Sequence, residues 1–238
     1  MVDLEAAKLR LTGIDRRDPA MVDGGHYQPG MFNIAERVAG SDWPATALTM
    51  IGLQRLSHLQ ECVEDVIQAG IPGDLIETGV WRGGACILMR LILEARQALD
   101  RVVWVADSFQ GMPVGDPEDV NQWNHPELAV SLAEVQENFR AWGVLDEHVR
   151  FIPGWFKDTL PGPVGCLAVL RLDGDYYTST RDVIRALYPK LSPGGYLIID
   201  DWGFGECQQA VNEYRDQHQI TEPIIEMGFS AYWRREPA

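Results

Sequence analysis

Two periodicities of apolar residues alternate along most of this chain, and together they predict a parallel α/β sheet. Short apolar runs typical of strands occupy residues 74–80, 101–108, 149–155, 166–173 and 196–201. Stretches with helical periodicity lie between them, at about 84–98, 131–142, 178–189 and 206–217. The strand-like runs lack polar alternation, which indicates that helices cover both faces of the sheet. Two late runs, 223–227 and 230–235, predict a closing antiparallel pair, so we expect seven strands, mostly parallel.

The first part of the chain has weaker periodicity. Breaking residues interrupt residues 1–45, where we expect short helices or a mobile arm; they are Gly13, Gly24, Gly25, Pro29, Gly30 and Pro44. Apolar residues at helical spacing predict one helix over 46–70, ended by Gly70 and Pro72. The chain then divides into an arm of residues 1–45, which we expect to act as a lid, and one α/β domain of residues 46–238.

Composition narrows the classes of function. The formal net charge is −15, and a surface this acidic repels phosphate backbones and anionic membranes, so we expect no nucleic-acid or membrane partner. No apolar run approaches the ~20 residues of a membrane helix, and the charged N-terminus lacks the apolar middle of a signal peptide. The four cysteines, at 62, 86, 166 and 207, form no CxxC motif. We expect a cytoplasmic protein with free thiols.

In an open parallel sheet, ligands bind at the carboxyl ends of the strands. The first strand ends in ETGVWRGG (77–84), whose glycines let a ligand approach the backbone. This segment is neither GxGxxG nor a Walker motif, which disfavours dinucleotides and nucleoside triphosphates. Glu77, an acid just before the glycine turn, suits a ligand with a positive charge and an amino group, and S-adenosylmethionine has both. Taken alone, the segment is equally compatible with a plain turn between a strand and a helix.

The next two strand ends suit other parts of that cofactor. The second strand ends at Asp107, whose carboxylate can accept hydrogen bonds from both hydroxyls of a ribose. The alternative is that Asp107 or Ser108 caps the following segment. The third strand ends with Trp155 and Phe156, two aromatic side chains that can flank an adenine ring. The alternative for these two is packing in the core.

The strongest signal comes from strands four and five. The fourth ends in Asp173-Gly174-Asp175 and the fifth in Asp200-Asp201. If these strands are neighbours, their ends lie only ~5 Å apart, and four carboxylates crowd one crevice unless protons or a cation neutralise them. Oxygen ligands of this kind suit Mg²⁺ or Ca²⁺ rather than zinc. The alternative, that these aspartates cap turns, requires two paired-acid motifs on successive strand ends by chance.

These features together predict methyl transfer to a hydroxyl oxygen. A sugar hydroxyl has a pKa far above neutrality, and a cation bound to two adjacent hydroxyl oxygens lowers that pKa. A free carboxylate can then take the proton as the oxygen attacks the methyl group. Asp173 and Asp175 flank Gly174, and in an extended backbone their side chains point to the same side. Both can therefore reach one crevice while touching different atoms.

Five segments resemble the macrocin O-methyltransferase family: LIETGVWRGGACILMR, VVWVADSFQGMP, VRFIPGWFKDTLP, LRLDGDYYTSTRDV and LSPGGYLIIDDW. They follow one another in the family's order over residues 43–235, whereas the first 40 residues match poorly. The resemblance implies a class I methyltransferase fold, S-adenosylmethionine as methyl donor and Mg²⁺ as metal. It also implies methylation of a deoxysugar hydroxyl on a glycosylated natural product, of the macrolide or aminocoumarin antibiotic type.

The resemblance also implies roles for single residues. It makes Asp173, Asp200 and Asp201 the metal ligands and Asp175 the general base. It places the segment WPATALTMIG (43–52) over the methyl donor and acceptor, with Trp43 where the family is expected to carry a tyrosine. From the motifs and the resemblance together, the predicted cofactor-binding residues are Glu77, Thr78, Gly79, Arg82, Gly83, Asp107, Ser108, Phe109, Gly154, Trp155, Phe156, Thr49 and Met50.

The expected partners are a small-molecule glycoside acceptor, which residues 112–130 are expected to contact, and further copies of the chain in a dimer or higher homo-oligomer. Two other functions stay open. A catechol-type metal-dependent O-methyltransferase shares the cofactor and the metal, but such enzymes usually hold a lysine near the base, where this chain offers Asp175. A non-catalytic domain of the same fold is expected to lose its charged site residues, whereas Glu77 and all four aspartates remain here.

Overall fold

The computed structural model describes residues 2–21, 30–114, 116–120 and 125–236, so the predicted breakers Gly24, Gly25 and Pro29 lie outside the described residues. A seven-stranded sheet in the order β3-β2-β1-β4-β5-β7-β6 forms its centre. β1 to β5 are parallel, and β7 is antiparallel to β5 and β6, which confirms the predicted class. The strands are β1 (Asp74–Thr78), β2 (Val103–Asp107), β3 (Val149–Pro153), β4 (Leu167–Leu172), β5 (Leu191–Ile199), β6 (Ile225–Met227) and β7 (Ser230–Arg234).

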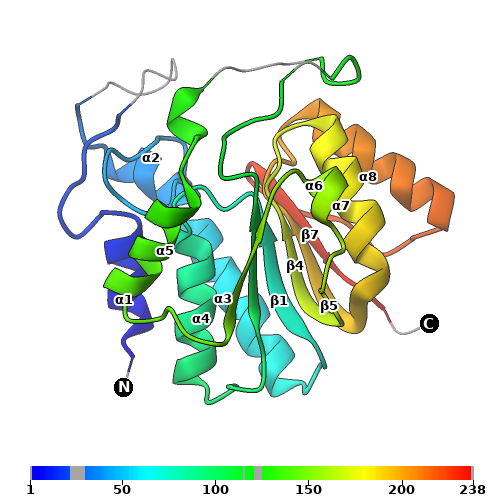
Figure 1. Cartoon of the computed structure of the whole chain (residues 1–238), viewed down its shortest axis with the longest axis horizontal. Helices are drawn as coiled ribbons and strands as arrows, with labels where there is room; N and C mark the ends of the chain where they lie inside the picture. Colours follow the sequence, from blue (N-terminus) through cyan, green and yellow to red (C-terminus); the bar gives the residue numbers. More distant parts are fainter. Residues whose placement is uncertain (1, 22–29, 115, 121–124, 237–238) are drawn as a thin grey trace.

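Helices cover both faces of the sheet, as Figure 1 shows. On one face, α1, α3, α4 and α5 bury their apolar sides in one core cluster, and α7 and α8 form a second cluster on the other face. The helices are α1 (Leu4–Leu11), α2 (Ile34–Ala39), α3 (Gly52–Gln68), α4 (Gly84–Ala95), α5 (Leu132–Ala141), α6 (Phe156–Thr159), α7 (Tyr177–Leu187) and α8 (Gly205–His218), with short 3₁₀ turns η1 (Pro126–Leu128) and η2 (Tyr188–Lys190). Because both faces of the strands are covered, their sequences are continuously apolar.

Two predicted boundaries lie furthest from those in the structure. The helix predicted over 46–70 begins at Gly52, whose φ is +76°. A Cβ on Gly52 would lie 2.3 Å from the backbone N of Gly40, so this point of contact with the arm requires glycine and interrupts the helix. Residues 46–51 instead form a loop. The strand predicted from residue 196 begins at Leu191, because Leu191 already pairs with Leu167 of β4.

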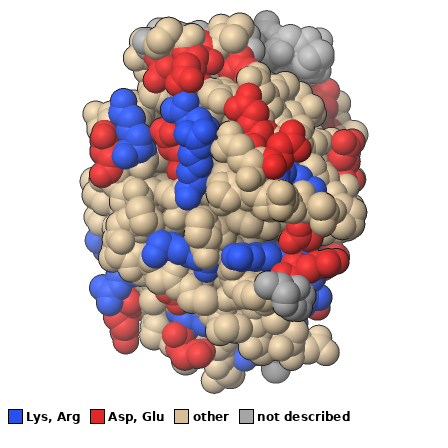
Figure 2. Space-filling view, turned by 90° about the vertical axis from the view of Figure 1, so that its right-hand side faces the viewer, with Lys and Arg blue, Asp and Glu red and all other residues tan. Residues whose placement is uncertain are grey.

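Basic side chains are scattered among acidic and uncharged ones on the face toward which α7 and α8 lie, as Figure 2 shows. Within the described ranges, every helix is too short or too polar to cross a membrane.

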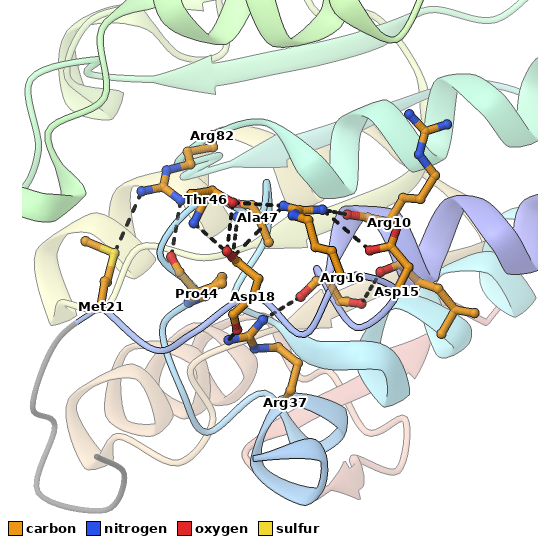
Figure 3. A network of polar contacts seen from close by, with 12 residues as sticks. Arg10, Asp15, Arg16, Asp18, Met21, Arg37, Pro44, Thr46, Ala47 and Arg82 are labelled. Carbon is orange, nitrogen blue, oxygen red and sulfur yellow. Dashed lines mark hydrogen bonds and ion pairs between the residues drawn. The ribbon is translucent and has the colours of Figure 1, made fainter. Parts of the chain in front are cut away.

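A buried polar network attaches the N-terminal residues to the rest of the molecule (Figure 3). Arg37 is completely buried and donates to both carboxylate oxygens of Asp42, at 2.7 and 2.8 Å. It also donates to the carbonyl oxygens of Thr12 and Asp18, both at 2.8 Å. The carboxylate of Asp18 in turn accepts hydrogen bonds from the backbone N–H groups of residues 46 and 47. The described part of the arm is therefore held by side chains that are far apart in sequence.

We expect Arg37→Met to lower the free energy of unfolding by roughly 3–5 kcal/mol, because it leaves the buried Asp42 carboxylate without its counter-ion. The measurement is urea unfolding followed by tryptophan fluorescence. Arg16→Met is the matched control: Arg16 approaches Asp18 in the same network, but its side chain is 42% exposed. It should cost no more than about 1 kcal/mol. Equal losses in the two variants would contradict the prediction.

Candidate active site

A cavity of about 790 Å³ opens at the carboxyl ends of the parallel strands. It brings together the glycine turn after β1, the ends of β2 and β3, and the acidic ends of β4 and β5. Nine of the predicted cofactor residues line it: Thr49, Met50, Glu77, Gly79, Asp107, Ser108, Gly154, Trp155 and Phe156. Asp173, Asp175, Asp200 and Asp201 line the same cavity. The structure thus joins the predicted cofactor turn and the predicted metal group in one site.

The turn after β1 depends on a glycine with no room for a side chain. Gly79 has φ +86°, and a Cβ there would lie 1.6 Å from the carbonyl oxygen of Asp173. Its N–H donates to the carbonyl of Ala106 in β2, and the N–H of Asp173 donates to the carbonyl of Thr78. Gly79 therefore lets the ends of β1 and β4 come into direct contact, which sets the cofactor turn beside the first aspartate.

The carboxylate of Glu77 makes an ion pair inside the protein. Glu77 is 2% exposed; its Oε1 pairs with Arg171, and its Oε2 accepts from the Sγ–H of Cys86 at 2.9 Å. Burial outweighs the effect of Arg171 and raises the pKa of Glu77 to about 7. Sequence reasoning did not single out Arg171, although a cation within the apolar run of β4 signals a buried acidic partner.

Asp107 organises the turn after β1. Its Oδ2 accepts from the N–H of Val80 at 2.8 Å, and its Oδ1 accepts from the N–H of Phe109 at 2.7 Å. Burial raises the pKa of Asp107 in spite of these hydrogen bonds. The side chain thus has the turn-capping contacts that were the alternative prediction, and it also lines the cavity, where the ribose prediction places it.

Four predicted cofactor residues stand outside the described cavity lining: Thr78, Arg82, Gly83 and Phe109. Arg82 donates to the carbonyl oxygens of Pro44 and Ala47, and so holds the arm rather than the cavity wall. Phe109 packs against Phe151, with ring centroids 6.3 Å apart. Contact of these four residues with a cofactor stays a prediction.

Three carboxylates form a compact group at the ends of β4 and β5, which are neighbours, the condition that the sequence prediction required. One oxygen from each of Asp173, Asp175 and Asp201 lies within 4.8 Å of the others. The sequence prediction placed Asp173 and Asp175 on an extended backbone. The structure differs, because Asp175 has φ +58°. Oδ2 of Asp201 accepts from the N–H groups of Gly174 and Asp175, at 3.0 and 2.9 Å, and stabilises that turn.

The fourth carboxylate, Asp200, makes ion pairs with two arginines. One oxygen pairs with Arg171 and the other with Arg55 of α3. Arg55 also donates to the carbonyl oxygens of Ile51, at 2.7 Å, and Gly40, at 2.8 Å. The guanidinium of Arg55 therefore links the arm to the acidic group, and nothing in the sequence pattern distinguishes it from an ordinary polar residue of a helix.

Negative charge is in excess at this site. Five carboxylates, from Glu77, Asp173, Asp175, Asp200 and Asp201, surround two guanidinium groups, which leaves three negative charges if all are ionised. Burial and the Asp200 charge raise the pKa of Asp173 to about 6. Burial and the Asp173 charge raise the pKa of Asp175 to about 8. Burial also raises the pKa of Asp201. An all-oxygen group with uncompensated charge fits a hard divalent cation.

A family model described as macrocin-O-methyltransferase matches residues 16–235 of this sequence. The chain belongs to this family. The match begins at residue 16, so the likeness extends further toward the N-terminus than the motifs indicated. The chain is accordingly an O-methyltransferase.

Relatives within the family are similar over nearly their whole length. The demethyldecarbamoylnovobiocin O-methyltransferase of Streptomyces niveus is 50% identical over 235 residues, which cover 94% of this chain and 90% of the relative. The mycinamicin III 3''-O-methyltransferase of Micromonospora griseorubida is 53% identical over 210 residues, covering 84% of this chain and 83% of the relative. The solved structure of the O-methyltransferase NovP superimposes with a TM-score of 0.91 at 50% identity, covering 98% of both chains.

Proposed function

We propose that this O-methyltransferase transfers a methyl group from S-adenosylmethionine to a deoxysugar hydroxyl of a glycosylated natural product, with Mg²⁺ bound at the acidic group. The observation that carries the proposal is the position of Asp173, Asp175 and Asp201 in the same cavity as the glycine turn at Gly79. Two relatives are named for methylation of demethyldecarbamoylnovobiocin and of mycinamicin III, and these names support a glycosylated antibiotic as acceptor.

The cofactor supplies an activated methyl group on a sulfonium, and the chain's part is to bind and orient it. Gly79 allows close approach to the backbone after β1, and the carboxylate of Asp107, which accepts hydrogen bonds from that turn, also lines the cavity where a ribose can reach it. Trp155 and Phe156 line the cavity at the end of β3, where they can pack against an adenine. Correct placement of donor and acceptor oxygen supplies much of the rate in such a transfer.

Asp173, Asp201 and the neighbouring Asp200 would hold the metal, although Asp200 is engaged by two arginines in this structure. A bound divalent cation supplies positive charge that lowers the pKa of an acceptor hydroxyl. Asp175 is then the residue that accepts the hydroxyl proton on a carboxylate oxygen. The backbone N–H of Asp175 donates to the carboxylate of Asp201, and this hydrogen bond holds the base in position beside the carboxylates that would bind the metal.

A methyl-transfer assay read by mass tests the function. Purified protein and S-adenosylmethionine are incubated with a glycosylated macrolide carrying an unmethylated deoxysugar, with an aminocoumarin glycoside and with a simple catechol. A gain of one methyl group on a glycoside, and not on the catechol, is expected. Methylation of the catechol alone would replace the proposal by the catechol-type function. The lid role of residues 1–45 and the homo-oligomeric state stay predictions.

Asp107→Ala and Glu77→Ala are expected to weaken S-adenosylmethionine binding by on the order of 1.5–3 kcal/mol each, the usual worth of a hydrogen bond to a charged group. Calorimetric titration measures the affinity. Asp74→Ala is the matched control, because Asp74 stands at the opposite end of β1 and its carboxylate also accepts two hydrogen bonds, from Val102 N, just before β2, and from Trp104 Nε1 of β2, both at 2.9 Å. Unchanged affinity in both site variants, or the same loss in Asp74→Ala, would contradict the assignment.

A further inference from the structure

Helix α7 begins without a cap of its own. Tyr176 occupies the N-cap position and makes no side-chain hydrogen bond to the helix, and the first turn contains no acidic residue. The first N–H groups of a helix have no partner within it, so a buried start needs acceptors from elsewhere. This start is important because Asp175, the proposed base, lies two residues before Tyr177.

The missing acceptor comes from the loop after β2, 59 residues earlier in the chain. Asp119 is only 5% exposed. Its Oδ1 accepts from the backbone N–H of Thr178 at 2.9 Å, and its Oδ2 accepts from the Thr178 hydroxyl at 2.7 Å. A negative charge at this end of a helix also interacts favourably with the helix dipole. Asp119 thus caps α7 from a distant segment.

A local turn presents the Asp119 side chain to the helix. Oδ1 of Asp116 accepts from the N–H of Glu118 at 3.0 Å, and the Asp116 carbonyl accepts from the N–H of Asp119 at 3.2 Å. Glu118 pairs with Arg181 of α7, but its side chain is 54% exposed. Exposed ion pairs contribute little to stability, so the buried contact of Asp119 is the stronger of these two attachments.

The two segments joined by Asp119 form one wall of the cavity. Met112, Pro113 and Val114 line it from the loop, and Ser179 and Arg181 line it from α7. Figure 1 shows the loop after β2 passing over the carboxyl end of the sheet toward α7. The glycine turn and Asp107 lie at the ends of β1 and β2, which this contact does not join.

We propose that Asp119 is a positioning residue for methyl transfer: by capping α7 it fixes the loop wall of the cavity relative to Asp175 and so sets where the acceptor hydroxyl lies. This inference rests on the proposed function, because it assumes that the acceptor binds between that wall and Asp175. Loss of the cap should therefore weaken acceptor binding and leave S-adenosylmethionine binding unchanged. A merely structural role would weaken both.

Asp119→Ala is expected to raise the KM for the glycosylated macrolide about tenfold, which corresponds to the ~1.4 kcal/mol typical of a lost N-cap. The Kd for S-adenosylmethionine should not change. In the protein without ligands, the backbone amides of residues 177–179 should exchange about tenfold faster. Asp119→Asn should recover most of both effects, because its amide oxygen still accepts from the N–H of Thr178.

Asp3→Ala is the matched control: the Asp3 carboxylate caps α1, accepting from the N–H of Ala6 at 3.0 Å, and α1 packs on α4 away from the cavity wall. It should leave the KM unchanged. If Asp119→Ala does not fold, Thr178→Val removes one donor only. Because Thr178 itself lines the cavity, the readout in this variant is the exchange of the amides of residues 177–179, which should become faster, together with an unchanged Kd for S-adenosylmethionine.

An unchanged KM in Asp119→Ala, or a KM and a Kd that rise together, would overturn the proposal. If the wild-type protein methylates no glycoside, the proposed function fails by itself. The exchange of residues 177–179 still tests the cap in that case, and unchanged exchange would overturn it.

Discussion

Removal of divalent metal is expected to abolish methyl transfer by this protein and to leave S-adenosylmethionine bound. Oxygens of Asp173, Asp175 and Asp201 lie close together at the ends of β4 and β5, where five carboxylates face only two guanidinium groups, whereas the glycine turn lies at the end of β1. A chelator should therefore remove the cation that acts on the acceptor hydroxyl without disturbing the cofactor's own contacts. Product mass and calorimetric titration of the cofactor, each with and without chelator, measure the two effects.

The control for this experiment is the same chelator saturated with Mg²⁺ before it is added, which should leave activity intact. Added Mg²⁺ should also restore the chelated protein. Asp173→Asn removes one predicted ligand, so it should shift the Mg²⁺ concentration needed for activity upward. Full activity in excess chelator, with no metal in the purified protein, would contradict the metal hypothesis.

Asp175→Asn is expected to lower turnover by roughly 10²–10⁴-fold, the usual contribution of a general base. The amide has the shape of the carboxylate but cannot take the hydroxyl proton. Asp175 adopts a left-handed backbone, with φ +58°, that asparagine tolerates as well as aspartate, so the turn should survive the change. Turnover at saturating substrates, together with titrations of cofactor and Mg²⁺, measures the effect.

Asp173→Asn is the matched comparison, since it lies two residues away in the same turn and loses the same charge. It should respond to added Mg²⁺, whereas Asp175→Asn should not. Near-normal turnover in Asp175→Asn would remove this residue from the proton transfer and leave it as another carboxylate around the cation.

The order of strands and helices was predictable from the sequence. A strand covered on both faces is a short apolar run, and a helix buried on one face has apolar residues at helical spacing, so each can be recognised from a short segment. The rule that parallel sheets bind ligands at the carboxyl ends of their strands then directed attention to Gly79, Asp107 and the acidic pairs from the sequence alone. The crowding of Asp173, Asp175 and Asp201 followed from one further condition, the adjacency of β4 and β5, which the structure confirms.

The partners of buried charges were decided only by the tertiary structure. Periodicity indicates that a side chain is buried but not which distant group it meets. No local pattern therefore pairs Asp200 with Arg55, 145 residues away, or Thr178 with Asp119. The start of α3 at Gly52 likewise depends on the close approach of Gly40. Such contacts join loops and helix ends that are distant in sequence, and they determine which of the strand-end carboxylates have an arginine counter-ion.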